Sequence, residues 1–235
     1  MLKQIALFGL VLFGLLFAAA CGVAKPASNP REAMTNANAS APITVTNTKA
    51  PKIIAFGDSL TIGLGLTEKE SYPSLLQEKL KANGYDHEVI NAGVSGDTSA
   101  GGLERIDWAL NQPNVEILIL ELGANDMLRG LSVAKMKENL REIIKRAKAK
   151  NVKVLLCGML APPSLGADYT REYAAAFRDL AKEEAVAFLP FFLEGVGGVK
   201  NLNQTDGIHP NAEGARRITE TVYKSLTPLL GKTQK

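Results

Sequence analysis

The chain has 235 residues, 46% hydrophobic and 22% charged, so it can bury one substantial core and does not require two domains. Its 27 lysines and arginines exceed its 24 aspartates and glutamates by only three, and no basic run accompanies the excess, which excludes a nucleic-acid footprint. Two cysteines and two histidines are too few for a disulfide-stapled scaffold or a cysteine/histidine zinc site.

The first twenty residues have the pattern of a secretion signal. Lys3 is the only charge before an apolar run over residues 5–20, which ends Ala18-Ala19-Ala20-Cys21. Small residues before a cysteine resemble the bacterial lipobox, in which Cys21 becomes the acylated first residue of the mature protein. We therefore predict a lipoprotein-type signal over residues 1–20 and an exported protein, facing the periplasm or the cell exterior, that meets the membrane through a lipid anchor at Cys21.

Three other interpretations of this segment stay open. The run could be an uncleaved membrane span, although its sixteen residues fall short of the roughly 20 that a span needs. Cleavage after Ala20 would instead release a soluble protein, and Cys21 could pair with Cys157 in a disulfide.

Residues 21–50 are rich in Pro, Ser, Thr and Asn with almost no large apolar residues, which predicts a disordered tether. The folded domain is then expected over residues 51–235.

Within that domain, short apolar segments alternate with helical patterns. Apolar runs rich in Val, Ile, Leu or Phe predict strands covered on both faces, at residues 52–57, 88–93, 115–122, 152–159 and 186–190. Apolar residues at three- and four-residue steps predict amphipathic helices after Ser71 and over residues 133–147, 169–180 and 218–226. This alternation predicts an α/β fold, a three-layer α/β/α sandwich around a parallel sheet of about five strands with right-handed crossovers.

Ligands of such sheets bind outside the carboxyl ends of the strands, and the unusual polar residues lie there. The first strand runs straight into Gly57-Asp58-Ser59-Leu60, where Ser59 is either a nucleophile or an ordinary turn or N-cap serine. Gly93 in the glycine-rich exit of the second strand and Asn125 after the third offer a backbone N–H and a side-chain amide. Both are donor types that an oxyanion requires, although turn chemistry alone would also explain them.

A serine nucleophile needs a base, and the base needs a partner that holds its tautomer. Asp206 and His209, three residues apart near the last helix, can point to the same side and supply both groups. The alternative is a helix-capping aspartate beside a surface histidine. The other histidine, His87, lies in a hydrophilic stretch and is expected to be exposed.

Taken in order, these motifs resemble the four blocks of the SGNH (GDSL) hydrolases: GDSL at residues 57–60, a glycine within NAGVSG, GxND at residues 123–126, and DxxH at residues 206–209. The match spans residues 53–212. Further stretches resemble the branch that contains the multifunctional acyl-CoA thioesterase I/lysophospholipase L1/arylesterase type: SGDTS (95–99), ELGANDMLRG (121–130), LPFF (189–192) and DGIHPN (206–211). Ala124 departs slightly from the pattern, because a second glycine often stands at that position.

The resemblance implies a flavodoxin-like sheet order and a set of roles. Ser59 would attack an acyl carbonyl, His209 would take its proton and return it to the leaving group, and Asp206 would orient His209. The N–H groups of Ser59 and Gly93 and the amide of Asn125 would surround the oxyanion. Water would then hydrolyse the acyl-enzyme, with no metal and no cofactor.

The substrate is expected to be a small-molecule or lipid ester. Candidate walls of an acyl groove are Ile62, Leu64, Met127, Leu128 and residues 159–165, with Leu160 and Pro162 among them, although any of these could belong to the core. A carbohydrate O-acetylesterase of the same family is the alternative enzyme, and a lipid-anchored binding module that has lost its reactivity is the alternative outside catalysis. Phosphate binding is disfavoured because neither GxxxxGK[ST] nor GxGxxG follows the first strand. The sequence does not indicate an oligomeric state.

Overall fold

A computed structural model describes residues 50–231, and these residues belong to a unit that spans Thr46–Lys235. The predicted signal peptide, Cys21 and almost all of the predicted tether lie outside the described residues. Between residues 50 and 231, no helix combines the length and the apolar character that crossing a membrane requires.

The five predicted apolar segments form one parallel sheet in the order β2-β1-β3-β4-β5. The strands are β1 (Lys52–Gly57), β2 (Glu88–Gly93), β3 (Val115–Glu121), β4 (Lys153–Cys157) and β5 (Ala187–Leu189). The last three are one to three residues shorter than the apolar runs that predicted them. An order of 2-1-3-4-5 is the flavodoxin-like one, so the predicted fold class and sheet order are confirmed.

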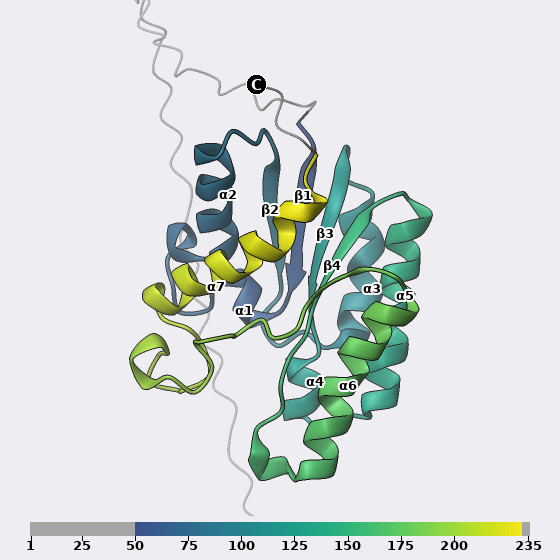
Figure 1. Ribbon diagram of the computed structural model, residues 1–235, viewed down its shortest axis with the longest axis vertical. Helices are drawn as coiled ribbons and strands as arrows, with labels where there is room; N and C mark the ends of the chain where they lie inside the picture. The colour runs from purple at the N-terminus through teal and green to yellow at the C-terminus, as the bar shows by residue number, and fades with distance from the viewer. Residues whose placement is uncertain (1–49, 232–235) are drawn as a thin grey trace, which may run out of the picture. The chain divides into compact units, whose positions relative to one another are not determined.

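Helices cover both faces of this sheet, with α2 and α7 on one face and α3, α5 and α6 on the other (Figure 1). The helices are α1 (Ser59–Ile62), α2 (Tyr72–Ala82), α3 (Ser99–Leu110), α4 (Ala124–Leu128), α5 (Val133–Ala149), α6 (Ala167–Glu183) and α7 (Ala212–Leu226), with short 3₁₀ turns at Glu68–Glu70, Pro163–Leu165, Lys200–Leu202 and Thr227–Leu229. The central strands are therefore covered on both sides, which explains their continuous apolar sequence.

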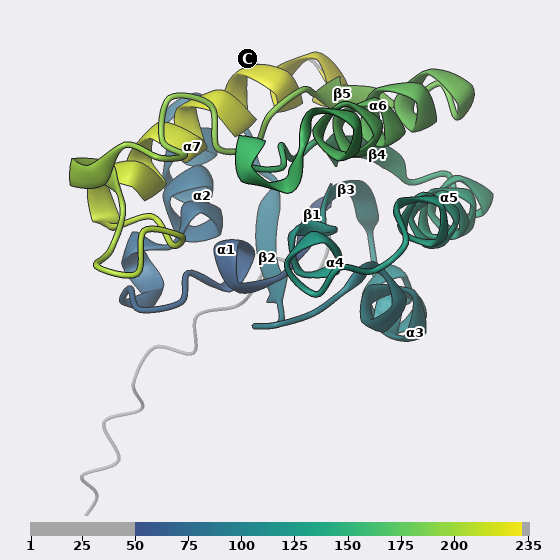
Figure 2. The same cartoon turned by 90° about the horizontal axis from the view of Figure 1, so that it is seen from below.

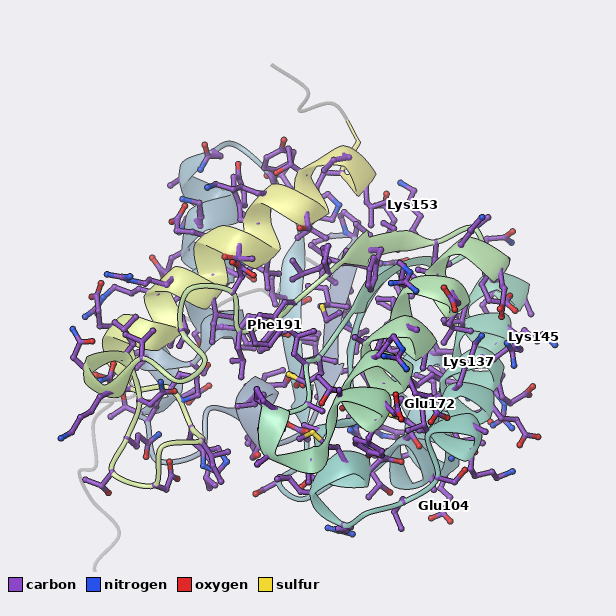
Figure 3. All side chains as sticks on the ribbon, turned by 60° about the horizontal axis from the view of Figure 1, so that its bottom comes forward. Glu104, Lys137, Lys145, Lys153, Glu172 and Phe191 are labelled. Atoms are coloured by element: carbon purple, nitrogen blue, oxygen red, sulfur yellow. The ribbon has the colours of Figure 1, made fainter. Side chains whose placement is uncertain are left out.

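The longer helices form where the sequence supplies both a cap and a buried stripe. Helix α2 begins after Ser71 with Pro73 in its first turn, and it buries Leu76 and Leu80. In α5, the Ser132 side chain accepts a hydrogen bond from a first-turn N–H, and the buried stripe includes Met136, Leu140 and Ile143. Charged side chains of this layer, such as Lys145 on α5 and Glu104 on α3, lie on its outer side (Figure 3).

The short helices α1 and α4 lie beyond the carboxyl ends of β1 and β3, toward the viewer in Figure 2. All five strands point to this end because they are parallel, so the segments that follow them gather there.

The expectation for His87 is wrong. Its ring is buried, with a relative exposure of 7%, and Nε2 lies 3.3 Å from Oε2 of Glu116 on β3. The residue immediately precedes β2, and its ring contacts Glu116 of β3 and the Tyr85 ring instead of facing solvent, while the Gln77 amide of α2 donates to its backbone carbonyl.

Candidate active site

Ser59 and His209 meet although 150 residues separate them in the sequence. Ser59 is the first residue of α1, directly after the carboxyl end of β1, and its Oγ lies 2.9 Å from Nε2 of His209. The turn is held by Asp58, the N-cap of α1, whose side chain accepts the Leu60 N–H at 3.0 Å. The serine is therefore presented to the imidazole by a capped helix start.

His209 is held in turn by Asp206. Nδ1 of His209 lies 2.7 Å from Oδ2 of Asp206, and Oδ1 of Asp206 accepts the N–H groups of Ile208 and His209 at 2.9 and 3.0 Å. These bonds, first of all the one from the His209 side chain, lower the pKa of Asp206 to about 2. An ionised carboxylate can only accept, so the imidazole proton lies on Nδ1, and Nε2 is free to accept the Ser59 hydroxyl proton.

The residues around the third strand end place Asn125 beside the nucleophile. Gly123 has φ +119° and caps α4; a Cβ there would lie 2.9 Å from the side chains of Met136 and Phe177, so this position requires glycine. Asp126 is buried and binds the N–H and the hydroxyl of Ser99 at 2.8 and 2.6 Å. Gly123 and Asp126 thus fix the start of α4, and Asn125 lies between these two residues in the chain.

The Asn125 amide is already engaged. Its Nδ2 donates to Oδ2 of Asp58 at 3.0 Å and to the Asp97 carbonyl at 2.9 Å. Burial raises the pKa of Asp58 to about 6, so this contact joins the amide to a carboxyl that titrates close to neutrality. Asn125 lies beside Ser59 in the wall of one cavity, as the sequence predicts.

The structure places the Gly93 N–H away from the cavity beside Ser59. Its N–H donates to Oδ1 of Asn91 at 3.0 Å, and Gly93 does not line the cavity that holds Ser59. A Cβ on Gly93 would collide with the backbone of Ile62, so its glycine character serves the close approach of β2 to α1. Gly96, which sequence reasoning passed over, lines the cavity with φ +79°, and among the described residues nothing accepts its N–H. The signal that could have found it is a second glycine in the same NAGVSG block.

The cavity beside Ser59 has a volume of about 370 Å³ and mostly apolar walls. Met127, Leu128, Leu160 and Pro162 line it as predicted, and so do Leu64 and Met159, whereas Ile62 does not. Segments that the sequence did not single out complete the wall, namely Leu193, Gly197, Gly198, Gly207 and Ile208. Leu64, Leu128, Leu160 and Ile208 are also exposed, so the opening of the cavity is apolar.

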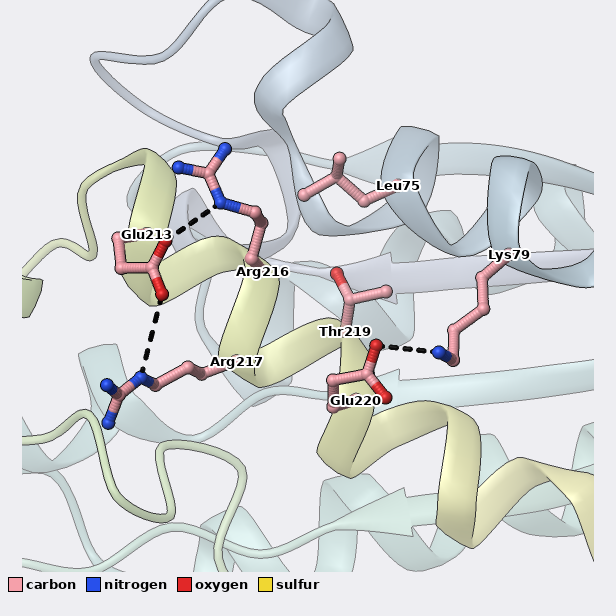
Figure 4. A pocket seen from close by; sticks show the side chains of 7 residues that line it. All are labelled: Leu75, Lys79, Glu213, Arg216, Arg217, Thr219 and Glu220. Carbon is pink, nitrogen blue, oxygen red and sulfur yellow. Dashed lines mark hydrogen bonds and ion pairs between the residues drawn. The ribbon is translucent and has the colours of Figure 1, made fainter.

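A second cavity, of about 300 Å³, lies between α2 and α7 and is built differently (Figure 4). Its charged groups are paired with each other: Lys79 with Glu220 at 2.6 Å, and Glu213 with Arg216 at 2.9 Å and with Arg217 at 3.9 Å. It contains none of the candidate catalytic residues. The described residues also contain no group of three or more His, Cys, Asp or Glu side chains that could hold a metal ion.

Comparison with known proteins gives a consistent result. Residues 55–217 match the model of the GDSL-like Lipase/Acylhydrolase family. The chain is 42% identical to Esterase TesA of Pseudomonas aeruginosa, over 77% of this chain and 90% of that protein. It is 36% identical to Thioesterase 1/protease 1/lysophospholipase L1 of Escherichia coli, over 77% of this chain and 86% of that protein. A crystal structure of TesA superposes with a TM-score of 0.74 at 42% identity, covering 76% of this chain and 99% of that one.

Proposed function

The chain belongs to the GDSL-like lipase/acylhydrolase family, and from this membership and the site geometry we propose that it hydrolyses carboxylic esters and thioesters of acyl chains through an acyl-enzyme on Ser59. It is a serine hydrolase, and its relatives include an esterase and a thioesterase/lysophospholipase. The observation that carries the proposal is the continuous series of contacts from Ser59 to His209 to Asp206.

In the proposed reaction, Ser59 Oγ forms a bond to the acyl carbon while its proton passes to Nε2 of His209. The carbonyl π electrons move to oxygen and return when the leaving alcohol or thiol departs with that proton. Water then repeats the sequence and releases the acid. Asp206 keeps the proton of the neutral imidazole on Nδ1 and stabilises the imidazolium, since its lowered pKa keeps it ionised.

The oxyanion would be stabilised by the N–H groups of Ser59 and Gly96 and by the Asn125 amide. Among the described residues, neither backbone N–H has an acceptor, and Asn125 lines the same cavity. To bind the oxyanion, the Asn125 amide would give up its hydrogen bond to Asp58 or to Asp97, or share that N–H with the oxyanion. Gly96 replaces Gly93 in this role because the Gly93 N–H is occupied by Asn91.

The apolar cavity favours acyl chains longer than acetyl. Arylesterase, lysophospholipase and thioesterase activities all fit a site that binds the acyl group and tolerates different leaving groups. The alternative carbohydrate O-acetylesterase would have little use for walls built by Met127, Leu128, Leu160 and Leu193.

The test is a series of p-nitrophenyl esters of increasing chain length. We expect kcat/KM to rise beyond acetate because added methylenes enter the apolar cavity, and we expect Ser59→Ala and His209→Ala to lower kcat by at least about 10³-fold. A strict acetyl preference would favour the O-acetylesterase.

A fluorophosphonate probe separates enzyme from binding module: it should label the wild type and not Ser59→Ala, and an unlabelled wild type would contradict catalysis.

We further propose export and lipid anchoring at Cys21, supported by the apolar run and the small residues before this cysteine. Cys157, the other cysteine, is a buried free thiol at the end of β4, which gives the alternative disulfide no exposed partner. Intact mass spectrometry of membrane-extracted protein should show a chain that begins with a diacylglyceryl-modified Cys21. A chain cleaved elsewhere, or an unmodified Cys21, would exclude the anchor.

A further inference from the structure

A buried carboxyl lies beneath the turn that carries the nucleophile. Glu121 is the last residue of β3 and has no exposed surface. Its Oε2 accepts the Thr61 hydroxyl at 2.8 Å and the Asp58 N–H at 3.4 Å. Its other oxygen, Oε1, is buried and has no hydrogen-bond partner among the described residues. The mechanism proposed above gives this side chain no role.

Both partners of Glu121 belong to the turn around Ser59. Asp58 directly precedes the serine and caps α1, and Thr61 lies two residues after it in the same helix. One carboxyl oxygen therefore holds the turn on both sides of the nucleophile. Through Asp58 it also reaches the Asn125 amide, which donates to the Asp58 side chain at 3.0 Å.

The sheet brings this carboxyl into place. Gly57 and Glu121 are paired in the register of β1 and β3, so the side chain of Glu121 lies next to the point where β1 turns into α1. A Cβ on Gly57 would collide with Thr61 Oγ1 and lie 2.5 Å from Glu121 Oε2. The glycine of the GDSL block thus leaves the space in which Glu121 and Thr61 meet.

A buried carboxyl at this position costs folding free energy, which indicates that Glu121 has a role other than filling the core. The four residues that precede it, Ile117 to Leu120, are fully buried and apolar, and an apolar side chain would fill the site without desolvating a carboxyl. Burial, reinforced by the neighbouring Asp58 charge, raises the pKa of Glu121 well above its usual range. Burial therefore favours the protonated carboxyl, and Oε2 accepts the two hydrogen bonds in either charge state.

We propose that Glu121 is a positioning residue for ester hydrolysis: by accepting from Thr61 and from the Asp58 N–H, it fixes the start of α1 so that Ser59 Oγ stays within reach of His209 and Asp58 stays against Asn125. The proposal rests on the proposed function, since it assigns Glu121 to the orientation of that nucleophile. Glu121 itself touches no substrate.

The first experiment compares Glu121→Gln with Glu121→Ala. The Gln oxygen can accept from Thr61 and Asp58 as the neutral carboxyl does, so this variant should keep kcat within about threefold. Glu121→Ala removes the acceptor and lets the turn move. It should lower kcat by roughly 10- to 100-fold with KM within about twofold, because a misplaced nucleophile affects the reaction and not the acyl cavity. Rates are measured per folded molecule, with the folded fraction taken from near-UV circular dichroism.

Two controls separate positioning from general loss of stability. Leu118→Ala makes a cavity in the same strand without touching the turn, so it should lower Tm while leaving kcat per folded molecule unchanged. Thr61→Val removes the hydroxyl that Glu121 binds, whereas Thr219→Val removes a buried hydroxyl on α7 that donates to the Ala215 carbonyl. Of these two substitutions, only Thr61→Val should lower kcat. In the double variant Thr61→Val/Glu121→Ala, the combined loss of kcat should be smaller than the product of the two single losses.

A folded Glu121→Ala with wild-type kcat would overturn the proposal, and so would a loss in Glu121→Gln as large as that in Glu121→Ala. If Glu121→Ala does not fold, Thr61→Val decides: unchanged kcat overturns the proposal and reduced kcat supports it. The wild type and Ser59→Ala are assayed in the same series. Activity that survives Ser59→Ala means that the proposed function has failed, whereas loss in Ser59→Ala with none in Glu121→Ala means that only the positioning role has failed.

Discussion

At the scale of single residues, the site combines carboxyl groups in contrasting surroundings. Asp206 is exposed and receives three hydrogen bonds, and its pKa falls to about 2. Asp58 is buried and has a pKa raised to about 6. Asp206 therefore stays ionised at every pH at which His209 needs a charged partner. Asp58 instead changes its charge within a pH range that experiments can reach. The two acids therefore have opposite effects on the pH dependence of stability.

For Asp58 the sign can be worked out. Its pKa is 3.8 in the reference state and about 6 in the folded protein, so between these values the folded state binds the proton more tightly. Its contribution to the free energy of unfolding is then largest below about pH 4 and falls as the pH rises through 6, by up to about 3 kcal/mol. Asp58→Asn cannot titrate and lacks this dependence.

The measurement is urea unfolding of the wild type and Asp58→Asn at pH 4 and pH 7. The wild type should lose stability relative to the variant as the pH rises, by about 1–3 kcal/mol. Comparing the two proteins cancels the opposite trend of Asp206 and of other acids that both share. A difference that is constant between the two pH values would show that Asp58 keeps its ordinary pKa in the fold.

At the scale of secondary-structure elements, one arginine joins the strand ends that build the site. Arg105 of α3 donates through its two Nη atoms to the Ala92 and Gly57 carbonyls at 2.8 and 2.9 Å and through Nε to Asp97 at 2.7 Å. Its guanidinium also lies 3.8 Å from the ring centroid of Phe56. It therefore holds the ends of β1 and β2 together with the segment that follows Gly96.

Arg105→Lys keeps the charge but loses the planar fork that serves three acceptors at once. We expect the free energy of unfolding to fall by about 1.5–3 kcal/mol, the range for hydrogen bonds to a charged group, and kcat to fall as the Gly96 segment loosens. The matched control is Arg146→Lys, whose partners Asp107 and Glu142 are exposed and whose effect should stay below about 1 kcal/mol. Urea unfolding and ester kinetics measure both; equal effects of the two substitutions would remove the special role of Arg105.

These element contacts also explain what the sequence could and could not reveal. Apolar runs separate the motifs, so the placement of Ser59 and Asn125 at strand ends, and of His209 just before the last helix, followed from the pattern alone. Glu121 was hidden because one acid at the end of an apolar run looks like the edge of a strand, and only the register that pairs it with Gly57 reveals its contact with α1. Gly93 was chosen over Gly96 because sequence does not show which N–H is already occupied.

At the scale of the whole molecule, the site forms only when the complete sheet has assembled. Ser59 follows the first strand and His209 precedes the last helix, so their contact forms only when β1, in the interior of the sheet, lies between β2 and β3. Every contact described here lies between residues 50 and 231, within the unit Thr46–Lys235. That unit should therefore fold and react without the preceding residues.

A chain that starts at Thr46 is predicted to match one that starts at Gly22 in both Tm and kcat/KM on a soluble ester, within about 2 °C and twofold, because it keeps every contact described above for the site and core. A chain that starts at Ser59 tests the other limit. It lacks β1, which pairs with two strands and buries Ile53, Ile54 and Phe56, so it should yield no cooperative unfolding transition. A loss of activity in the Thr46 chain would instead place part of the working enzyme in residues 22–45 and would move the domain boundary toward the N-terminus.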